Sequence, residues 1–241
     1  MTHPKHDKAD DLAELKEVIT ADGSITFHNP KYDSEYHSRS GAEEEAVKKY
    51  AEQSNLAELA KTEHSIRILD ICFGIGYNSA AAIDAINAVD PKCSINVLGI
   101  DNDPQIIAKI QDVNSKFLSY DKIKKLSKNK INEKQHWVKE DNVQMMLFIN
   151  DARIVLKMLA KENNPALRFD AVFLDPFSPI KCPELWTEDF FKDIRMVMKK
   201  KAVLVTYSCA RAVRDNLKHA GFIVKDGQCI GRRGPSTIAV N

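Results

Sequence analysis

The sequence predicts an α/β fold: a doubly wound, mainly parallel sheet with an antiparallel C-terminal strand and a small N-terminal extension. Short apolar segments typical of strands alternate with segments of helical length from residue 61 onward, which indicates a parallel sheet. One of them, Ile66–Asp70, leads through a turn with two glycines into a helix rich in small residues. Acidic residues follow several of these strands, so the same edge of the sheet is a candidate ligand site.

Two regions are expected, an N-terminal extension at residues 1–60 and a main domain at residues 61–241. In the extension, the alternating segment Ser24–His28 predicts a strand, and the capping pattern at Ser40–Glu43 predicts a helix that continues to about Ala60. The strands expected in the main sheet are Ile66–Asp70, Ile95–Ile100, Met145–Ile149, Phe169–Asp175, Val203–Tyr207, Phe222–Val224 and Ile238–Val240.

Composition excludes several classes of protein. A formal net charge of +1 over 241 residues argues against electrostatic binding of nucleic acid by the whole molecule, although a local basic patch remains compatible with it. Five cysteines without C-x-x-C spacing indicate reduced thiols and neither a disulfide framework nor a zinc site. No apolar segment has membrane-spanning length and no secretory signal is present, so a cytoplasmic protein is expected.

Four predicted strands end in or beside a carboxylate: Asp70, Asp101, Asp151 and Asp175. In a doubly wound sheet these ends line one crevice at the point where the strand order reverses. A single Asp there is an ordinary loop or cap residue, and two glycines can simply soften a turn that holds no ligand. Four acids along one edge, beside such a turn, favour a ligand site.

The turn also restricts the type of ligand. Ser79 stands where a dinucleotide-binding pattern requires a third glycine, and no Gly-Lys-Ser/Thr phosphate loop is present. A ligand with ribose hydroxyls and no phosphate suits the acids better. Asp101 can accept hydrogen bonds from ribose hydroxyls, Asp151 from the amine of adenine, and Asp70 suits a cationic amino-acid group. S-adenosyl-L-methionine combines these features.

The same residues resemble a known family. The run Ile68–Gly76, with Asp101 and Asp151, is similar to the cofactor motifs of Rossmann-like class I methyltransferases. More specifically, three segments resemble the methyltransferase half of the MnmC-type tRNA-modifying enzymes. These segments are Asp22–Ser24, Tyr36–Ala42 and Phe169–Trp186.

The resemblance implies an enzyme that uses S-adenosyl-L-methionine and no metal. It implies methylation of 5-aminomethyl-uridine to 5-methylaminomethyl-uridine at the wobble position of tRNA. Bifunctional members carry a flavin-dependent oxidase domain after the methyltransferase half. This chain ends at Asn241, so a stand-alone methyltransferase is expected, with a separate oxidase or upstream modification enzyme as a candidate partner.

The resemblance also assigns site residues. Those expected to contact the cofactor are Tyr36, His37, Ser38, Asp70, Phe73, Gly74, Gly76, Asn78, Asp101, Asn102, Asp151, Ala152 and Asp175. Those expected to contact the substrate are Pro176, Phe177, Lys181, Arg232 and Arg233.

Asp175 resembles the catalytic residue of the family. A methyl acceptor needs a free lone pair, and Asp175 can hold the amine by hydrogen bonds while its charge offsets the cationic groups. An exposed Asp has a pKa near 4 and is a weak base for an ammonium, so positioning and electrostatics are its expected contribution. The alternative is a carboxylate that caps the following loop. His37 has a structural alternative, and Phe177 is a base-stacking or a core residue.

Three alternatives stay open. The lysine-rich stretch at residues 111–140 is either a solvated face or an arm that contacts RNA phosphates. An aminopropyl or small-amine transferase of the polyamine-synthase type would also use this fold and an acid-lined amine site. A non-catalytic nucleotide- or RNA-binding regulator would bind the cofactor without transferring its methyl group.

Overall fold

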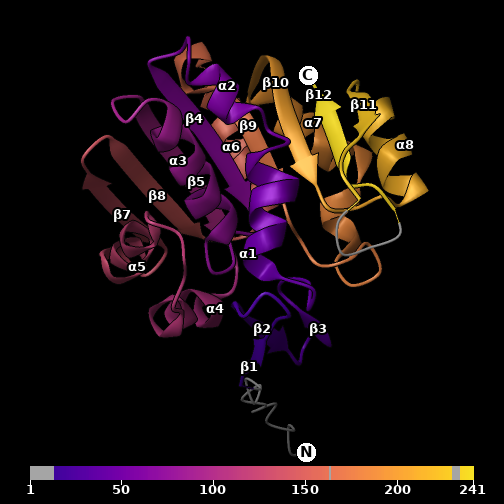
Figure 1. Cartoon of the computed structure of the whole chain (residues 1–241). Coiled ribbons are helices and arrows are strands. Elements are labelled where there is room, and N and C mark those ends of the chain that lie inside the picture. The colour runs from indigo at the N-terminus through magenta and orange to yellow at the C-terminus, as the bar shows by residue number, and fades with distance from the viewer. Residues whose placement is uncertain (1–13, 163, 230–233) are drawn as a thin grey trace, which may run out of the picture.

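A nine-stranded sheet organises the main part of the chain (Figure 1). The computed structural model describes residues 14–162, 164–229 and 234–241. The strand order is β11-β12-β10-β9-β4-β5-β8-β7-β6, and the five strands from β10 to β8 are parallel. Their bounds are β4 Ser65–Ile71, β5 Ser94–Asp101, β6 Lys130–Asn132, β7 Gln135–Glu140, β8 Val143–Ile149, β9 Phe169–Leu174, β10 Met198–Thr206, β11 Ile223–Asp226 and β12 Thr237–Val240. The predicted fold class, with its antiparallel C-terminal strand β12, is confirmed.

Helices cover both faces of this sheet. One face packs against the helical region of the N-terminal extension and against α3 and α5, and the other packs against α6, α7 and α8. The helices are α1 Ala42–Glu45, α2 Leu56–Leu59, α3 Tyr77–Val89, α4 Pro104–Lys109, α5 Tyr120–Lys128, α6 Ala152–Glu162, α7 Glu188–Met196 and α8 Arg211–His219. A π-helical segment, Ala46–Ala51, connects α1 to the turn before α2.

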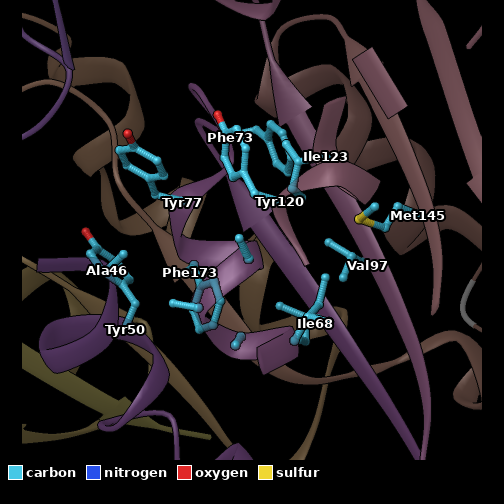
Figure 2. Packing of buried hydrophobic residues seen from close by; sticks show 14 of the residues in the cluster. Ala46, Tyr50, Ile68, Phe73, Tyr77, Val97, Tyr120, Ile123, Met145 and Phe173 are labelled. Carbon is cyan, nitrogen blue, oxygen red and sulfur yellow. The ribbon is translucent and has the colours of Figure 1, made fainter. Parts of the chain in front are cut away.

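Strand β4 lies between the two cores and is buried on both faces. Ile66 and Ile68 belong to one core, whereas Leu69 and Ile71 belong to the other, as the alternation of side chains along a strand requires. Figure 2 shows Ile68 within the first core, which also contains Tyr50, Tyr77 and Phe173. A strand buried on both faces reads as a continuous apolar run, which is why this element could be predicted from sequence.

The N-terminal extension forms a separate three-stranded antiparallel sheet beside the carboxyl ends of the central strands (Figure 1). Its strands are β1 Lys16–Ile19, β2 Ile25–Asn29 and β3 Ser34–Glu35. Hydrogen bonds attach it to the main domain. Tyr77 donates to the carbonyl of Ile25 at 3.0 Å, and Tyr36 donates to Oδ2 of Asp103 at 2.6 Å. The extension therefore covers the edge of the sheet where the ligand site was predicted.

One prediction about the elements was wrong. The single helix expected up to Ala60 consists of α1, the π-helical segment that continues it, and a separate α2, with the break at Asn55, which takes a left-handed conformation with φ 59°. The lysine-rich stretch contains α5 and the β6–β7 hairpin, which extends the sheet beyond β8. β6 has only three residues, all exposed, so it lacks the alternation of buried and exposed positions that identifies a strand.

None of the helices in the described ranges is both long enough and apolar enough to cross a lipid bilayer.

Gly76 and Gly23 offer a matched test of the turn before α3. Both have left-handed backbones, with φ 80° and 82°. A Cβ on Gly76 would lie 2.7 Å from Ile123 and 2.8 Å from Phe73, whereas one on Gly23 meets nothing within 4 Å. We expect Gly23→Ala to cost about 1–2 kcal/mol from backbone strain and Gly76→Ala about 2–5 kcal/mol, since overpacking is added. Urea unfolding measures both, and equal costs would contradict this packing.

Candidate functional site

A cavity of about 290 Å³ lies between the N-terminal extension and the carboxyl ends of the central strands. β4 has β5 on one side and β9 on the other, so the strand order reverses here, as predicted for a ligand site. The residues that line the cavity are Tyr32, Ser34, Glu35, Tyr36, His37, Ser38, Arg39, Glu45, Cys72, Gly74, Asp101, Asn102, Asp103, Asp175, Pro176, Phe177, Ser178, Cys182, Glu184, Leu185 and Tyr207.

The wall of the cavity is strongly acidic. Its carboxylates belong to Glu35, Glu45, Asp101, Asp103, Asp175 and Glu184. Arg39 is the one Lys or Arg side chain among the lining residues that the structure describes, and it is paired with Glu35. A cavity with this balance favours a cationic ligand over a phosphate.

The turn after β4 forms the floor of the cavity. The amides of Cys72 and Phe73 both donate to the carbonyl of Ile100 at the end of β5, at 2.8 and 3.0 Å. Cys72 and Gly74 have left-handed φ values of 65° and 55°, and for the non-glycine Cys72 such a backbone stores strain. The next amide, of Gly74, donates to Oδ2 of Asp101 at 2.8 Å. The turn is therefore fixed to the neighbouring strand.

Asp101 is buried at the end of β5. Burial raises the pKa of its carboxyl to about 6, although the amides of Asp103 and Gly74 donate to it and oppose this shift. Asn102 follows it on the cavity wall. Both oxygens of Asp101 already accept one hydrogen bond and each retains a lone pair, so hydroxyl groups of a ligand can still donate to it.

Asp70 does not reach the cavity wall. It is fully buried beneath the turn, where Ser79 donates to its Oδ2 at 2.6 Å and its Oδ1 has no partner among the described residues. Burial raises the pKa of Asp70 to about 8. Phe73 and Gly76 also shape the turn from inside, because the Phe73 ring packs where a side chain on Gly76 would stand.

Asp151, Ala152 and Lys181 also lie outside the cavity wall. Asp151 precedes α6 and pairs with Arg153, which lowers the pKa of its carboxyl, and Ala152 begins that helix. Lys181 is exposed and adjoins the cavity-lining Cys182. The predicted substrate residues Arg232 and Arg233 lie outside the described residues.

Tyr36, His37 and Ser38 do line the cavity, as predicted. The imidazole of His37 lies 3.1 Å from Oγ1 of Thr26, and burial lowers its pKa to about 4, so the ring is neutral at neutral pH. His37 therefore has a structural contact with Thr26 and also forms part of the cavity wall. The amide of Ser38 donates to Oε2 of Glu45 at 2.9 Å.

Asp175 follows β9 and faces the cavity. Asn78 donates to its Oδ2 at 2.9 Å. Burial, followed by the charge of Glu45, raises the pKa of Asp175 to about 6, so the group is mainly ionised at neutral pH. Among the described residues, no amide of the following loop donates to its carboxylate. The geometry therefore favours a carboxylate that serves the cavity over one that caps the loop.

Aromatic rings close one side of the cavity. The rings of Phe177 and Tyr32 stack with centroids 4.6 Å apart and an angle of 26° between their planes, and Tyr36 lies 5.1 Å from Phe177. Phe177 thus belongs to the cavity wall. Its loop is anchored from behind, because Trp186 and Tyr207 donate to the carbonyls of Phe177 and Pro176, both at 2.9 Å.

Glu45 and Lys49 form a buried ion pair that the sequence analysis missed. Nζ of Lys49 lies 2.6 Å from Oε1 of Glu45, and their side chains are 3% and 8% exposed. Burial alone would raise the pKa of Glu45, but Lys49 outweighs it and the pKa is lowered. The Glu-x-x-x-Lys spacing among buried alanines was the available signal, yet on most helices this spacing marks a solvated pair.

The lysine-rich stretch is partly neutralised. Lys122 pairs with Glu140 and Asp141, and Lys125 pairs with Glu140. For these two lysines the structure favours the solvated-face interpretation.

Comparisons with known proteins agree with this geometry. Residues 114–241 match a family described as S-adenosyl-L-methionine-dependent methyltransferase. The chain is 31% identical over 234 residues to the uncharacterized protein MJ0670 of Methanocaldococcus jannaschii, which covers 95% of this chain and 61% of that one. It is 27% identical over 211 residues to the tRNA 5-methylaminomethyl-2-thiouridine biosynthesis bifunctional protein MnmC of Paraburkholderia xenovorans. That match covers 85% of this chain and 32% of the relative, so the chain spans about a third of it.

A solved structure is also similar throughout. The crystal structure of MNMC2 from Aquifex aeolicus matches with a TM-score of 0.78 and 31% identity, over 95% of this chain and 71% of that one. The predicted resemblance and the predicted fold are both confirmed.

Asp70→Asn tests the burial of the carboxyl beneath the turn. Because the folded-state pKa is raised to about 8, the wild-type protein loses stability as the pH rises from about 4 through about 8. Asn does not titrate and still accepts from Ser79. The stability of Asp70→Asn relative to wild type should therefore increase over this range and become constant above it. Urea unfolding across the range measures the difference, and a pH-independent difference would refute the assignment.

Lys49→Met tests the buried ion pair. Removing the ammonium leaves the Glu45 carboxylate buried and unpaired, which should cost about 3–5 kcal/mol of folding free energy. Lys48→Met on the same helix is the matched control, because the Lys48–Glu44 pair is 43% and 40% exposed and should contribute little. Equal effects of the two substitutions in thermal or urea unfolding would argue against a buried pair.

Proposed function

The chain belongs to a family of S-adenosyl-L-methionine-dependent methyltransferases, and from this premise we propose that it methylates an amine of tRNA. The proposed reaction converts 5-aminomethyl-uridine at the wobble position to 5-methylaminomethyl-uridine. The names of relatives such as MnmC support this substrate. A separate oxidase or upstream enzyme would supply the aminomethyl group, and a location in the cytoplasm is part of the proposal.

The acidic cavity carries this proposal. Six carboxylates (Glu35, Glu45, Asp101, Asp103, Asp175 and Glu184) line it, and its one described Arg is already paired. Both proposed ligands are cationic at their reacting ends, the sulfonium of the cofactor and the protonated aminomethyl group of the acceptor. Carboxylates in a partly desolvated cavity stabilise such cations more strongly than they would in water.

The residues present fit the cofactor. We assign the ribose hydroxyls to Asp101 and Asn102, next to the amide-rich turn at Gly74, and the covering wall to Tyr36, His37 and Ser38. When bound, S-adenosyl-L-methionine supplies an electrophilic methyl group. The shape of the turn depends on Asp70, Phe73 and Gly76, whereas Asn78 acts through its hydrogen bond to Asp175. We propose Asp151 and Ala152 as neighbours of the adenine.

Asp175 holds the acceptor. Its carboxylate is mainly ionised at neutral pH, because its pKa is raised only to about 6, and it can accept hydrogen bonds from the aminomethyl nitrogen. This orients the nitrogen lone pair toward the methyl group, and such positioning supplies about 7–11 kcal/mol in favourable cases. An ammonium has no lone pair, so the amine reacts in its neutral form, and the proton is lost to solvent in the equilibrium that precedes attack. Attack on the methyl group breaks its bond to sulfur and leaves a positive charge on the methylated amine, which Asp175 stabilises.

The aromatic side of the cavity is the proposed position of the uracil. Phe177, held by its anchored loop beside Pro176, offers a ring for stacking, as aromatic residues do for unpaired RNA bases. Lys181 lies near this side, and we propose that it contacts a phosphate together with Arg232 and Arg233. We also propose a division of the chain into an extension at residues 1–60 and a methyltransferase domain at residues 61–241.

Asp175→Asn tests the reaction. An anticodon stem-loop with 5-aminomethyl-uridine at the wobble position is incubated with methyl-labelled cofactor, then digested to nucleosides. We expect label in 5-methylaminomethyl-uridine with the wild-type protein, and a loss of about 10²–10⁴-fold in kcat/KM for Asp175→Asn. The Kd for S-adenosyl-L-methionine, measured by calorimetry, should rise much less than kcat/KM falls, because Asp101, Asn102 and the Tyr36–Ser38 wall are retained.

Asp189→Asn is the matched control, because the Asp189 side chain is 93% exposed on α7. Label in polyamines alone would favour the aminopropyl-transferase alternative. Cofactor binding without any transfer would favour the regulator.

A further inference from the structure

Tyr50 is a buried residue whose hydroxyl has no hydrogen-bond partner among the described residues. The side chain is fully buried, and its ring packs edge-on against Phe173 of β9 with centroids 5.7 Å apart. Figure 2 shows the two rings close together within the core. A buried hydroxyl without a hydrogen-bond partner destabilises the folded state. A neighbouring acceptor that can move into hydrogen-bonding distance would explain why a tyrosine stands here.

The neighbouring group is Asp175, two residues beyond Phe173. Burial and, after it, the charge of Asp175 raise the pKa of Tyr50 far above its usual value, and a hydrogen-bonding interaction with the hydroxyl lowers the pKa of Asp175. The two groups are therefore close neighbours, although the hydroxyl does not reach full hydrogen-bond geometry with the carboxylate. A small movement of the carboxylate toward Tyr50 would satisfy the hydroxyl.

Tyr50 stands on the π-helical segment Ala46–Ala51. At the end of this segment the amide of Glu52 donates to the carbonyl of Val47, five residues earlier. Both Tyr50 and the residue before it, Lys49, are buried. Such π-helical turns occur frequently at functional sites.

Several other charged or titratable groups face Asp175. Glu45 and Lys49 approach from the helix side as a tight pair, Asp70 and Cys72 come from β4 and the turn after it, and Tyr207 lines the same cavity. The acids raise the affinity of Asp175 for a proton. Asn78 is its one hydrogen-bond donor within the described structure, so one oxygen of the carboxylate lacks a fixed donor.

We propose that Tyr50 is a positioning residue, whose hydroxyl donates a hydrogen bond to the Asp175 carboxylate and holds it ionised for a cationic amine. Asn78 fixes Oδ2 from the side of α3, and Tyr50 fixes the carboxylate from the helical region of the extension. With both donors in place, the carboxylate has one orientation and keeps lone pairs free for the amine. This role rests on the proposed function, since it assigns Asp175 to the acceptor.

Tyr50→Phe removes the hydroxyl and keeps the ring. The titration of Asp175 is followed by carboxyl ¹³C NMR in protein without tRNA or cofactor, with the resonance identified by its absence in Asp175→Asn. We expect a midpoint of about 6 in wild type and a rise of roughly one pH unit in Tyr50→Phe, a ten-fold higher proton affinity, because a donor to the charged form is lost.

Tyr120→Phe is the matched control. Tyr120 is also buried, but its hydroxyl donates to the carbonyl of Ile75 at 2.8 Å, so the Asp175 midpoint should stay at the wild-type value. An unchanged midpoint in Tyr50→Phe, with a raised melting temperature, would overturn the proposal and leave the hydroxyl as a purely unfavourable group. Because this titration needs no substrate, its result is independent of whether tRNA is methylated.

Discussion

The attachment of the Cys72–Gly76 turn to the end of β5 is the constraint on which the site depends. Two consecutive amides donate to Ile100 and the next donor, Gly74, binds Asp101. These bonds hold a strained, left-handed backbone between two parallel strands, where polar groups would otherwise lack partners. The same turn starts α3, and α3 carries Asn78 to Asp175. The short segment from Gly74 to Asn78 therefore links the Asp101 side of the cavity to the Asp175 side.

The cavity concentrates negative charge at a cost that the fold offsets locally. Burial raises the pKa values of Asp101 and Asp175 to about 6, so both carboxylates are mainly charged at neutral pH. Their charged forms are less favourable here than they would be in water. Lys49 compensates Glu45, and backbone amides compensate Asp101. Asp175 accepts one amide donor, from Asn78. A cation that docks beside Asp175 removes part of this unfavourable energy.

Much of this arrangement could be predicted from the sequence, because it follows from local patterns. The apolar runs predict the strands β4, β5 and β9, and the acids that follow these runs mark the carboxyl edge of the sheet. Asp101 and Asp175 both line the cavity at this edge. Local patterns do not determine how deeply a side chain is buried. Asp70 and Asp101 follow similar runs, yet Asp70 points into the core beneath the turn and Asp101 faces the cavity.

Contacts between distant segments were beyond sequence reasoning for a related reason. Glu45, Lys49 and Tyr50 stand on a helix that carries no motif for chemistry, and their proximity to Asp175 arises only when that helix packs on β9. The π-helical segment that carries Lys49 and Tyr50 was not expected from the sequence, where the capping pattern at Ser40–Glu43 predicted one ordinary helix. Tyr32 was missed likewise, since its importance lies in a ring contact with Phe177, 145 residues later in the chain.

The stacking of Tyr32 on Phe177 also decides how the two predicted regions relate. A cavity wall that needs a ring from the extension and a ring from the loop after β9 is incomplete in either region alone. Tyr36 strengthens this connection, because it contacts Phe177 and donates to Asp103, the residue that caps α4. The extension is thus a structural part of the site. A boundary near residue 60 divides the sequence, but residues from both sides of it form the same cavity.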